Sequence, residues 1–145
     1  MAVNPRQKGA VGENKVKEFL EARTPYTFTR TPGSGSGAIK GDLWIEGKNN
    51  RFCIEVKNYA ESPLNDKIFT SKTNNFVIWW TKLQKQAKPK KPLLIFRYNR
   101  SQMFVATDIK PTNSENYIDI RWLNCYCLLL DEWIQKENIE WLISK

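Results

Sequence analysis

Residues 33–57 read GSGSGAIKGDLWIEGKNNRFCIEVK, and this stretch predicts a loop that leads into a β-hairpin. The centre of the hairpin, Gly47-Lys48-Asn49-Asn50, has the composition of a tight turn. The flanking stretches Asp42–Glu46 and Arg51–Lys57 are therefore predicted to form two antiparallel strands. Glycine and serine dominate the residues before the first strand, so that approach is expected to be irregular.

The register of the hairpin follows from its turn. A turn centred between Lys48 and Asn49 places Asp42 opposite Glu55. Side chains alternate across a sheet, and this register gives one wholly apolar face, which supports it. The apolar face is expected to hold Leu43, Ile45, Phe52, Ile54 and Val56. The other, exposed face is expected to hold Asp42, Trp44, Glu46, Arg51, Cys53, Glu55 and Lys57.

Two opposed carboxylates on the exposed face indicate a cation site. Directly opposed residues have Cβ atoms about 4.5–5.5 Å apart, and like charges there are destabilising. Hard divalent ions such as Mg²⁺ take oxygen ligands, typically one or two carboxylates with water and substrate phosphate. Lys57 lies on the same face as Glu55 and is placed to hold a water or a phosphate oxygen. The alternative is an ordinary amphipathic hairpin with a salt-bridged row of charges on its solvent face.

Gly41-Asp42 followed by Glu55-Val56-Lys57 resembles the signature of the PD-(D/E)XK nucleases, with glycine in place of the proline that often precedes the aspartate. An N-terminal helical Glu13, the glycine-serine loop and D…ExK follow one another as in the archaeal-type Holliday-junction resolvases and their phage relatives, which the chain resembles over about its first hundred residues. The resemblance implies a restriction-endonuclease-like single α/β domain over residues 1–145, with a mixed central sheet flanked by helices.

The resemblance also implies a metal centre. In it, Asp42, Glu55 and the carbonyl of Val56 would hold Mg²⁺, for which Mn²⁺ is expected to substitute. Lys57 would orient the nucleophile or stabilise charge on the phosphate in the transition state.

Glu13 is expected on the buried side of a helix over residues 11–23, because it lies in phase with Val16 and Leu20. A buried carboxylate is costly without a partner. The alternative is a first-turn glutamate that favours the helix dipole. The resemblance favours a third acidic residue at the metal site, and it implies that Ser36 of the glycine-serine loop assists there.

A second helix is predicted over Phe76–Lys88. Its apolar positions, expected in the core, are Phe76, Trp79, Trp80 and Leu83. Gln86, followed by a Lys-Pro run and the strand Leu93–Arg97, resembles the fourth motif of many such nucleases, in which a helical glutamine faces the metal site. Gln84 is the rival position, and an ordinary surface glutamine is the alternative.

The composition indicates a globular protein that binds a polyanion. The chain has 23 Lys plus Arg against 15 Asp plus Glu, a net charge of +8, which is typical of nucleic-acid-binding proteins. Residues 82–100 contain seven basic residues and no acidic one, which favours a face that binds the DNA backbone over a merely solvated run. The residues expected to contact DNA are Arg30, Lys40, Lys85, Lys88, Lys90 and Lys91.

Histidine is absent, which removes Ser-His and Cys-His nucleophile systems and leaves carboxylates, metal and lysine for hydrolysis. Three cysteines in apolar company suggest reduced thiols, and their spacing disfavours a zinc site. No apolar run approaches a membrane span of about 20 residues, and the N-terminus lacks a signal-peptide core. We therefore expect no membrane association and a cytoplasmic location, in the host cytoplasm if the chain is phage-encoded.

The remaining elements are short. Strands are predicted at Tyr26–Thr31, Gln102–Ala106, Tyr117–Ile120 and Cys125–Leu130, and helical segments at Leu64–Phe69 and Leu130–Gln135. The resemblance does not extend over residues 107–145. The apolar tail with Trp122, Trp133 and Trp141 supplies either core or a dimer face.

The function expected from these features is Mg²⁺-dependent endonucleolytic hydrolysis of DNA, at four-way or other branched junctions, by a homodimer that makes paired nicks. One alternative is a nicking, restriction-like or repair nuclease of the same fold acting on unbranched duplex. The other is a non-catalytic DNA-binding module that keeps only the basic face.

Overall fold

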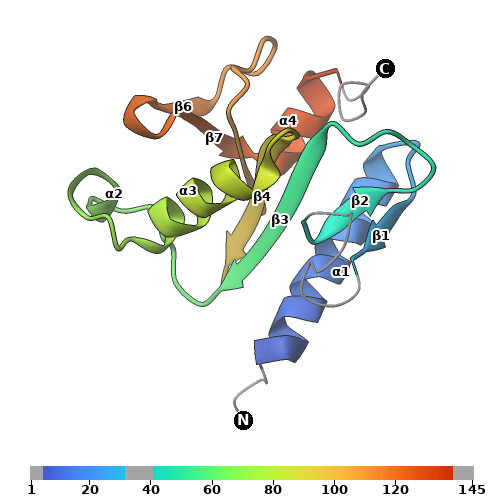
Figure 1. Cartoon of the computed structure of the whole chain (residues 1–145), viewed down its shortest axis with the longest axis horizontal. Coiled ribbons are helices and arrows are strands. Elements are labelled where there is room, and N and C mark those ends of the chain that lie inside the picture. The colour runs from blue at the N-terminus through green and yellow to red at the C-terminus, as the bar shows by residue number, and fades with distance from the viewer. Residues whose placement is uncertain (1–4, 32–40, 139–145) are drawn as a thin grey trace.

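A seven-stranded mixed sheet forms the centre of the computed structural model, which describes residues 5–31 and 41–138 (Figure 1). The strands are β1 (Phe28–Arg30), β2 (Leu43–Ile45), β3 (Phe52–Tyr59), β4 (Lys91–Tyr98), β5 (Phe104–Thr107), β6 (Tyr117–Ile120) and β7 (Cys125–Leu129). They lie in the order β1-β2-β3-β4-β5-β7-β6. The pair β3–β4 is parallel and the other neighbours are antiparallel. The expected α/β fold with a mixed sheet is confirmed.

Helices cover both faces of this sheet. They are α1 (Pro5–Arg23), α2 (Lys67–Thr70), α3 (Asn75–Ala87) and α4 (Leu130–Lys136), with a 3₁₀ turn, η1 (Arg121–Leu123). Val16 of α1 and Trp133 of α4 belong to the core on one face, and Trp80 of α3 belongs to the core on the other. No helix in the described ranges is long and apolar enough to cross a membrane.

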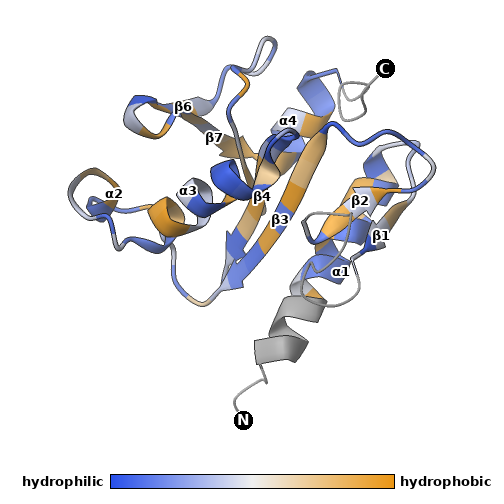
Figure 2. Cartoon of the chain, in the orientation of Figure 1, coloured by the Kyte–Doolittle hydropathy of each residue, from blue (hydrophilic) through white to orange (hydrophobic). Residues whose placement is uncertain are grey.

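The two faces of β3 belong to these two cores. Phe52 and Ile54 pack with Leu43 and Ile45 beneath α1, as the alternation of the sequence predicts. On the opposite face, Cys53 is buried beneath α3, so the face expected to be exposed is covered where the strand begins. Figure 2 shows β3 changing from mainly hydrophobic residues at its start to hydrophilic ones toward its end. The polar face therefore opens only in the second half of the strand.

The predicted hairpin register is confirmed, because Leu43 of β2 pairs with Ile54 of β3. Gly47 in the turn has a φ of +68°, a left-handed conformation that glycine adopts without strain. The Asn50 side chain fixes the turn end of the hairpin. Its Oδ1 accepts from the Ile45 N–H at 2.7 Å and its Nδ2 donates to the Ile45 carbonyl at 3.0 Å.

Gly41 explains why proline is absent before Asp42. Its φ is +93°, whereas proline is locked near −65°. A Cβ on Gly41 would lie 2.6 Å from the carbonyl oxygen of Ile54, too close for any side chain. The backbone at this position therefore requires glycine.

Several predicted boundaries differ from those observed. The first helix begins at Pro5 rather than Val11, which a proline in a first helical turn permits. The first strand is limited to Phe28–Arg30, and β3 continues past Lys57 to Tyr59 because it pairs with β4 as far as Tyr98. The second helix and the last three elements lie within a residue or two of the predicted ranges.

Candidate active site

Asp42 is fixed between two strands by its own backbone. Its N–H donates to the carbonyl of Ile54 at 2.6 Å, and its carbonyl accepts from the Thr31 N–H at 2.9 Å. Its side chain turns toward β3, where Oδ2 accepts from the N–H of Val56 at 2.8 Å. The Asp42 carboxylate therefore lies against the Glu55-Val56 peptide.

Glu55 lies beside this carboxylate in a largely buried environment. Its Oε2 atom is buried and has no hydrogen-bond partner among the described residues. Burial and the negative charge of Asp42 raise the pKa of Glu55 to about 8, against the opposing effect of Lys57 and Lys82. Two ionised carboxylates are both acceptors, so neither satisfies the other unless one carries a proton. The pair therefore takes up either a proton or a cation at neutral pH.

A divalent ion fits the donors that the pair offers. Mg²⁺ is commonly bound by one or two carboxylates and completes its shell with water and substrate phosphate. Among the described residues, no group of three or more His, Cys, Asp or Glu side chains is arranged to hold a metal ion. The Asp42–Glu55 pair matches the smaller donor set, and an ion there would satisfy the buried Oε2 atom of Glu55. The predicted role of the Val56 carbonyl stays a prediction.

Glu13 approaches the pair from α1. The helix comes close to β3 at Gly12, where a Cβ would lie 2.9 Å from that of Asn58. Burial and the Asp42 charge raise the pKa of Glu13, and Arg30 opposes this effect. Its Oε1 atom accepts from Nε and Nη2 of Arg30, each at 3.3 Å. Glu13 thus lies near Asp42 but is held by an arginine. It does not belong to a three-carboxylate group within the described chain.

Arg30 has a partner that the sequence did not reveal. It was expected to contact DNA, and its ion pair with Glu13 partly neutralises its charge while 39% of the side chain stays exposed. Ser36 and Lys40, two further predicted site residues, lie outside the described residues.

Lys82 is a residue that sequence analysis did not single out. It is exposed on α3. Its positive charge and the positive charge of Lys57 both lower the pKa of Glu55. Its position one residue before the buried Leu83 and one turn before Gln86 is the signal that could have identified it.

The two candidate glutamines of α3 differ in their surroundings. Gln84 donates from Nε2 to the carbonyl of Leu123 at 3.2 Å, so the rival position serves the packing of η1. Gln86 is exposed, and its role in the site stays a prediction.

The predicted lysine run lines a hollow of about 640 Å³ at the amino end of β3 and β4. The hollow includes Lys85, Lys88, Lys90 and Lys91. Lys91 pairs in register with Phe52, whereas Lys57 pairs with Phe96. At about 3.3 Å per residue the run is roughly 16 Å along the strands from Lys57.

Contacts within the protein engage lysines of this run. Lys90 donates from Nζ to the carbonyl of Asn50, and Lys91 forms an ion pair with Asp108 at 3.6 Å. Part of the basic charge at this end of the sheet is therefore already engaged in contacts within the protein.

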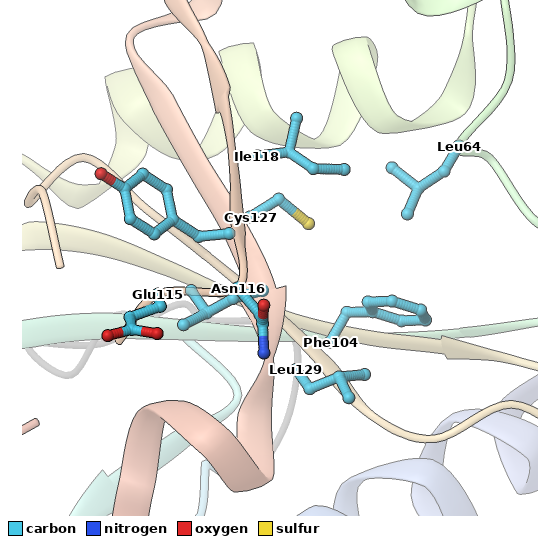
Figure 3. Close-up of a pocket in the computed structure, with 9 residues that line it drawn as sticks. Leu64, Phe104, Glu115, Asn116, Ile118, Cys127 and Leu129 are labelled. Atoms are coloured by element: carbon cyan, nitrogen blue, oxygen red, sulfur yellow. The ribbon is translucent and has the colours of Figure 1, made fainter. Parts of the chain in front are cut away.

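Another hollow, of about 360 Å³, lies at the far edge of the sheet (Figure 3). Leu64, Phe104, Ile118, Cys127 and Leu129 line it, with Glu115 and Asn116 beside them. The strands that line it, β5, β7 and β6, are two to four places from β3 in the sheet, roughly 10–19 Å at the usual spacing. This hollow is therefore separate from the acidic pair.

Comparison with known proteins gives three findings. A family described as "Phage putative PDDEXK endonuclease" matches residues 4–143. "Protein D14" of Escherichia phage T5 is 28% identical over 160 residues, with 99% of this chain and 100% of that protein covered. The structure of Archaeoglobus fulgidus Hjc, a Holliday junction resolvase from an archaeal hyperthermophile, aligns with a TM-score of 0.45 at 12% identity, over 90% of this chain and 96% of that one. This last likeness is too weak to support a conclusion.

Proposed function

Because the chain belongs to the phage PDDEXK endonuclease family, we propose that it is a Mg²⁺-dependent DNA endonuclease whose ion is held by Asp42 and Glu55. The observation that carries the proposal is the buried, unpartnered Oε2 atom of Glu55 beside a second carboxylate. Nucleases with the PD-(D/E)XK motif generally use a divalent ion, and Mn²⁺ is expected to replace Mg²⁺ here.

Each residue of the site then has a chemical task. A bound divalent ion supplies Lewis-acid chemistry, which neutralises phosphate charge and makes a water more acidic. Asp42 offers one carboxylate oxygen while the other stays bound to the Val56 N–H, which fixes its direction. Lys57 donates from Nζ to a phosphate oxygen and stabilises the charge that develops there. Glu13, positioned by Arg30, adds negative potential beside Asp42.

The substrate we propose is a four-way DNA junction. The net charge of +8 suits a large polyanion. A junction has approximate two-fold symmetry, and a homodimer would supply two equivalent sites for paired nicks. Ile118 is 57% exposed and Trp122 is 53% exposed, and they offer apolar surface at the β6 edge for such an interface. We place this activity in the cytoplasm, or in the host cytoplasm if a phage encodes the chain.

A cleavage assay with matched substrates tests the proposal. Labelled duplex, flap and four-way-junction DNA of the same sequence are incubated with the protein in Mg²⁺, in Mn²⁺ and in EDTA. We expect metal-dependent nicking that is fastest on the junction. Asp42→Asn and Glu55→Gln should each lower the rate by more than about a hundredfold.

Glu18→Gln is the matched control, because it removes the same charge at an exposed position of α1. Equal rates for Glu55→Gln and Glu18→Gln would refute the site. Equal rates on junction and duplex would leave a nicking or repair nuclease for unbranched DNA. Sedimentation of a monomer, both free and on the junction, would refute the paired-nick mechanism. Binding without cleavage in either metal would indicate a non-catalytic DNA-binding module.

A further inference from the structure

The polar face of β3 ends in an exposed aromatic ring. Cys53, Glu55, Lys57 and Tyr59 alternate onto the same face of the strand. Cys53 is buried beneath α3, whereas Tyr59 is 41% exposed. The face therefore emerges from under the helix as it passes the acidic pair and the candidate catalytic lysine.

The Tyr59 ring is supported from within the protein. Its centroid lies 4.7 Å from that of Trp79, which is only 7% exposed. Trp79 contacts Phe96 at 6.4 Å, and Phe96 stacks on Phe104 at 5.2 Å with an interplanar angle of 15°. Such aromatic contacts hold ring positions beyond the effect of burial alone. Tyr59 thus presents a supported ring to solvent.

Helix α3, whose Trp79 supports this ring, also carries two exposed residues. Ile78 is 43% exposed, and Lys82 lies one turn further along the same side of the helix. Helix α3 packs on the face of β3 that carries Glu55, because Cys53 of that face belongs to the same buried cluster as Trp79 and Leu83. Because α3 connects the parallel strands β3 and β4, it runs opposite to β3. The direction from Lys82 to Ile78 along α3 is therefore the same as the direction from Glu55 to Tyr59 along β3.

Together these residues form what we call the stacking patch: Lys57, Tyr59, Ile78 and Lys82. The patch combines two cations with two apolar groups, and it begins at Lys57, two residues along β3 from the proposed ligand Glu55. In intact duplex DNA the bases are stacked inside, and a surface that met only phosphates would need no aromatic ring. Proteins that hold unpaired strands combine basic residues for the backbone with aromatic side chains on which bases stack. The patch has both components.

We propose that Tyr59 stacks on a base that has left its pair close to the scissile phosphate, so that a substrate that presents a nucleotide outside the helix at the cleavage point is preferred over continuous duplex. This inference rests on the proposed nuclease function and narrows its substrate class. Tyr59 is four residues beyond Glu55, roughly 13 Å along β3. At 3.4 Å per nucleotide, that span places the stacked base within about four nucleotides of the cut. Lys57 and Lys82 would bind the phosphates on either side.

Pairs of substrates that differ by one base test the inference. Each pair is a duplex with a short unpaired segment at the cleavage point, identical except that one nucleotide carries a base or is abasic. We expect wild type to cleave the complete substrate roughly tenfold faster at one position, in line with the effect of one stacked base. Tyr59→Phe should keep this discrimination, and Tyr59→Ala and Tyr59→Leu should lose it. The Leu variant keeps apolar contact with Trp79, so it guards against a folding defect.

Phe69→Ala is the matched control, because Phe69 is an aromatic residue that is 75% exposed and lies on α2 rather than on α3 or β3. It should discriminate as wild type does. Equal discrimination by folded Tyr59→Leu and wild type would overturn the inference while leaving the nuclease intact. If Tyr59→Leu instead changes the sedimentation of the free protein without changing discrimination, the patch is an interface between copies and the inference fails.

Failure of the nuclease proposal would be visible separately. If wild type cleaves none of the substrates, fluorescence anisotropy measures binding of the same pairs. A preference of wild type for the complete oligonucleotide over the abasic one, absent in Tyr59→Leu, would support stacking without cleavage. Equal affinities of wild type for the two oligonucleotides would overturn it.

Discussion

Glu55→Gln should make the metal-free protein increasingly more stable than wild type as the pH rises. In wild type, burial and the Asp42 carboxylate raise the pKa of Glu55 from 4.5 to about 8. A folded-state pKa above the unfolded value means that folding favours the protonated form. The stability from this group is therefore complete below pH 4.5 and is lost as the pH rises through about 8. A glutamine is neutral at every pH, so the variant does not lose this stability.

The size of the effect follows from the same pKa values. Each pH unit between them costs wild type about 1.4 kcal/mol of unfolding free energy. From pH 4.5 to pH 7 the loss reaches roughly 3 kcal/mol. For a chain of this size that is a fall of about 6–12 °C in Tm. Mg²⁺ should offset the loss in wild type, because a bound cation stabilises the ionised pair.

Thermal unfolding in EDTA at several pH values between 5 and 8 measures this pH-dependent difference in stability. Wild type, Glu55→Gln and the exposed control Glu18→Gln are compared, so that titrations common to all three cancel. The gap between Glu55→Gln and wild type should widen with pH, while Glu18→Gln follows wild type. A gap that stays constant across this range would show that Glu55 is not a buried carboxyl beside a second charge.

Three further predictions concern DNA binding and the framework around the site. Replacing Lys88, Lys90 and Lys91 together by Ala should make the slope of log K against log salt less steep by about 0.9 for each DNA phosphate that the variant no longer neutralises. Fluorescence anisotropy on duplex DNA measures this slope. An unchanged slope would mean that this end of the sheet faces away from DNA. Gly41→Ala should lower the free energy of unfolding by about 1–3 kcal/mol, because its Cβ would lie 2.6 Å from a backbone oxygen at a φ of +93°; a denaturant midpoint equal to that of wild type would contradict this. Glu137→Gln should cost about 1–3 kcal/mol, because the carboxylate accepts from backbone and hydroxyl donors of residues 112–114. Burial would raise the pKa of Glu137, but these hydrogen bonds lower it overall from its ordinary value of 4.5. The difference between variant and wild type should therefore shrink as the pH falls below 4.5 and through that lowered pKa.

The hairpin shows what the sequence could specify. A turn signal and strict alternation determined the register, since a slip of one residue would have placed the apolar side chains of β3 in solvent. The same residues gave the PD-(D/E)XK resemblance, and the family match over residues 4–143 confirms it. The second helix was equally clear, because Phe76, Trp80 and Leu83 recur with helical spacing and are all buried.

Contacts between distant segments were not predictable from local pattern. Arg30 pairs with Glu13 of α1, and Gln84 bonds to Leu123 far along the chain. From the sequence, the lysines around Lys91 were expected close to the site. The parallel register of β3 and β4 instead puts them at the end of β3 that is far from Lys57. Neither hydropathy nor charge spacing reports which end of a strand lies near a carboxylate on another strand.

The most direct test of the proposed metal centre is calorimetric titration of Mn²⁺ into the protein without DNA. We predict that wild type and Glu18→Gln bind the ion with equal affinity and that Asp42→Asn loses this binding, because the ion depends on both carboxylates of the pair. Undiminished Mn²⁺ binding by folded Asp42→Asn would contradict a metal site built on Asp42 and Glu55.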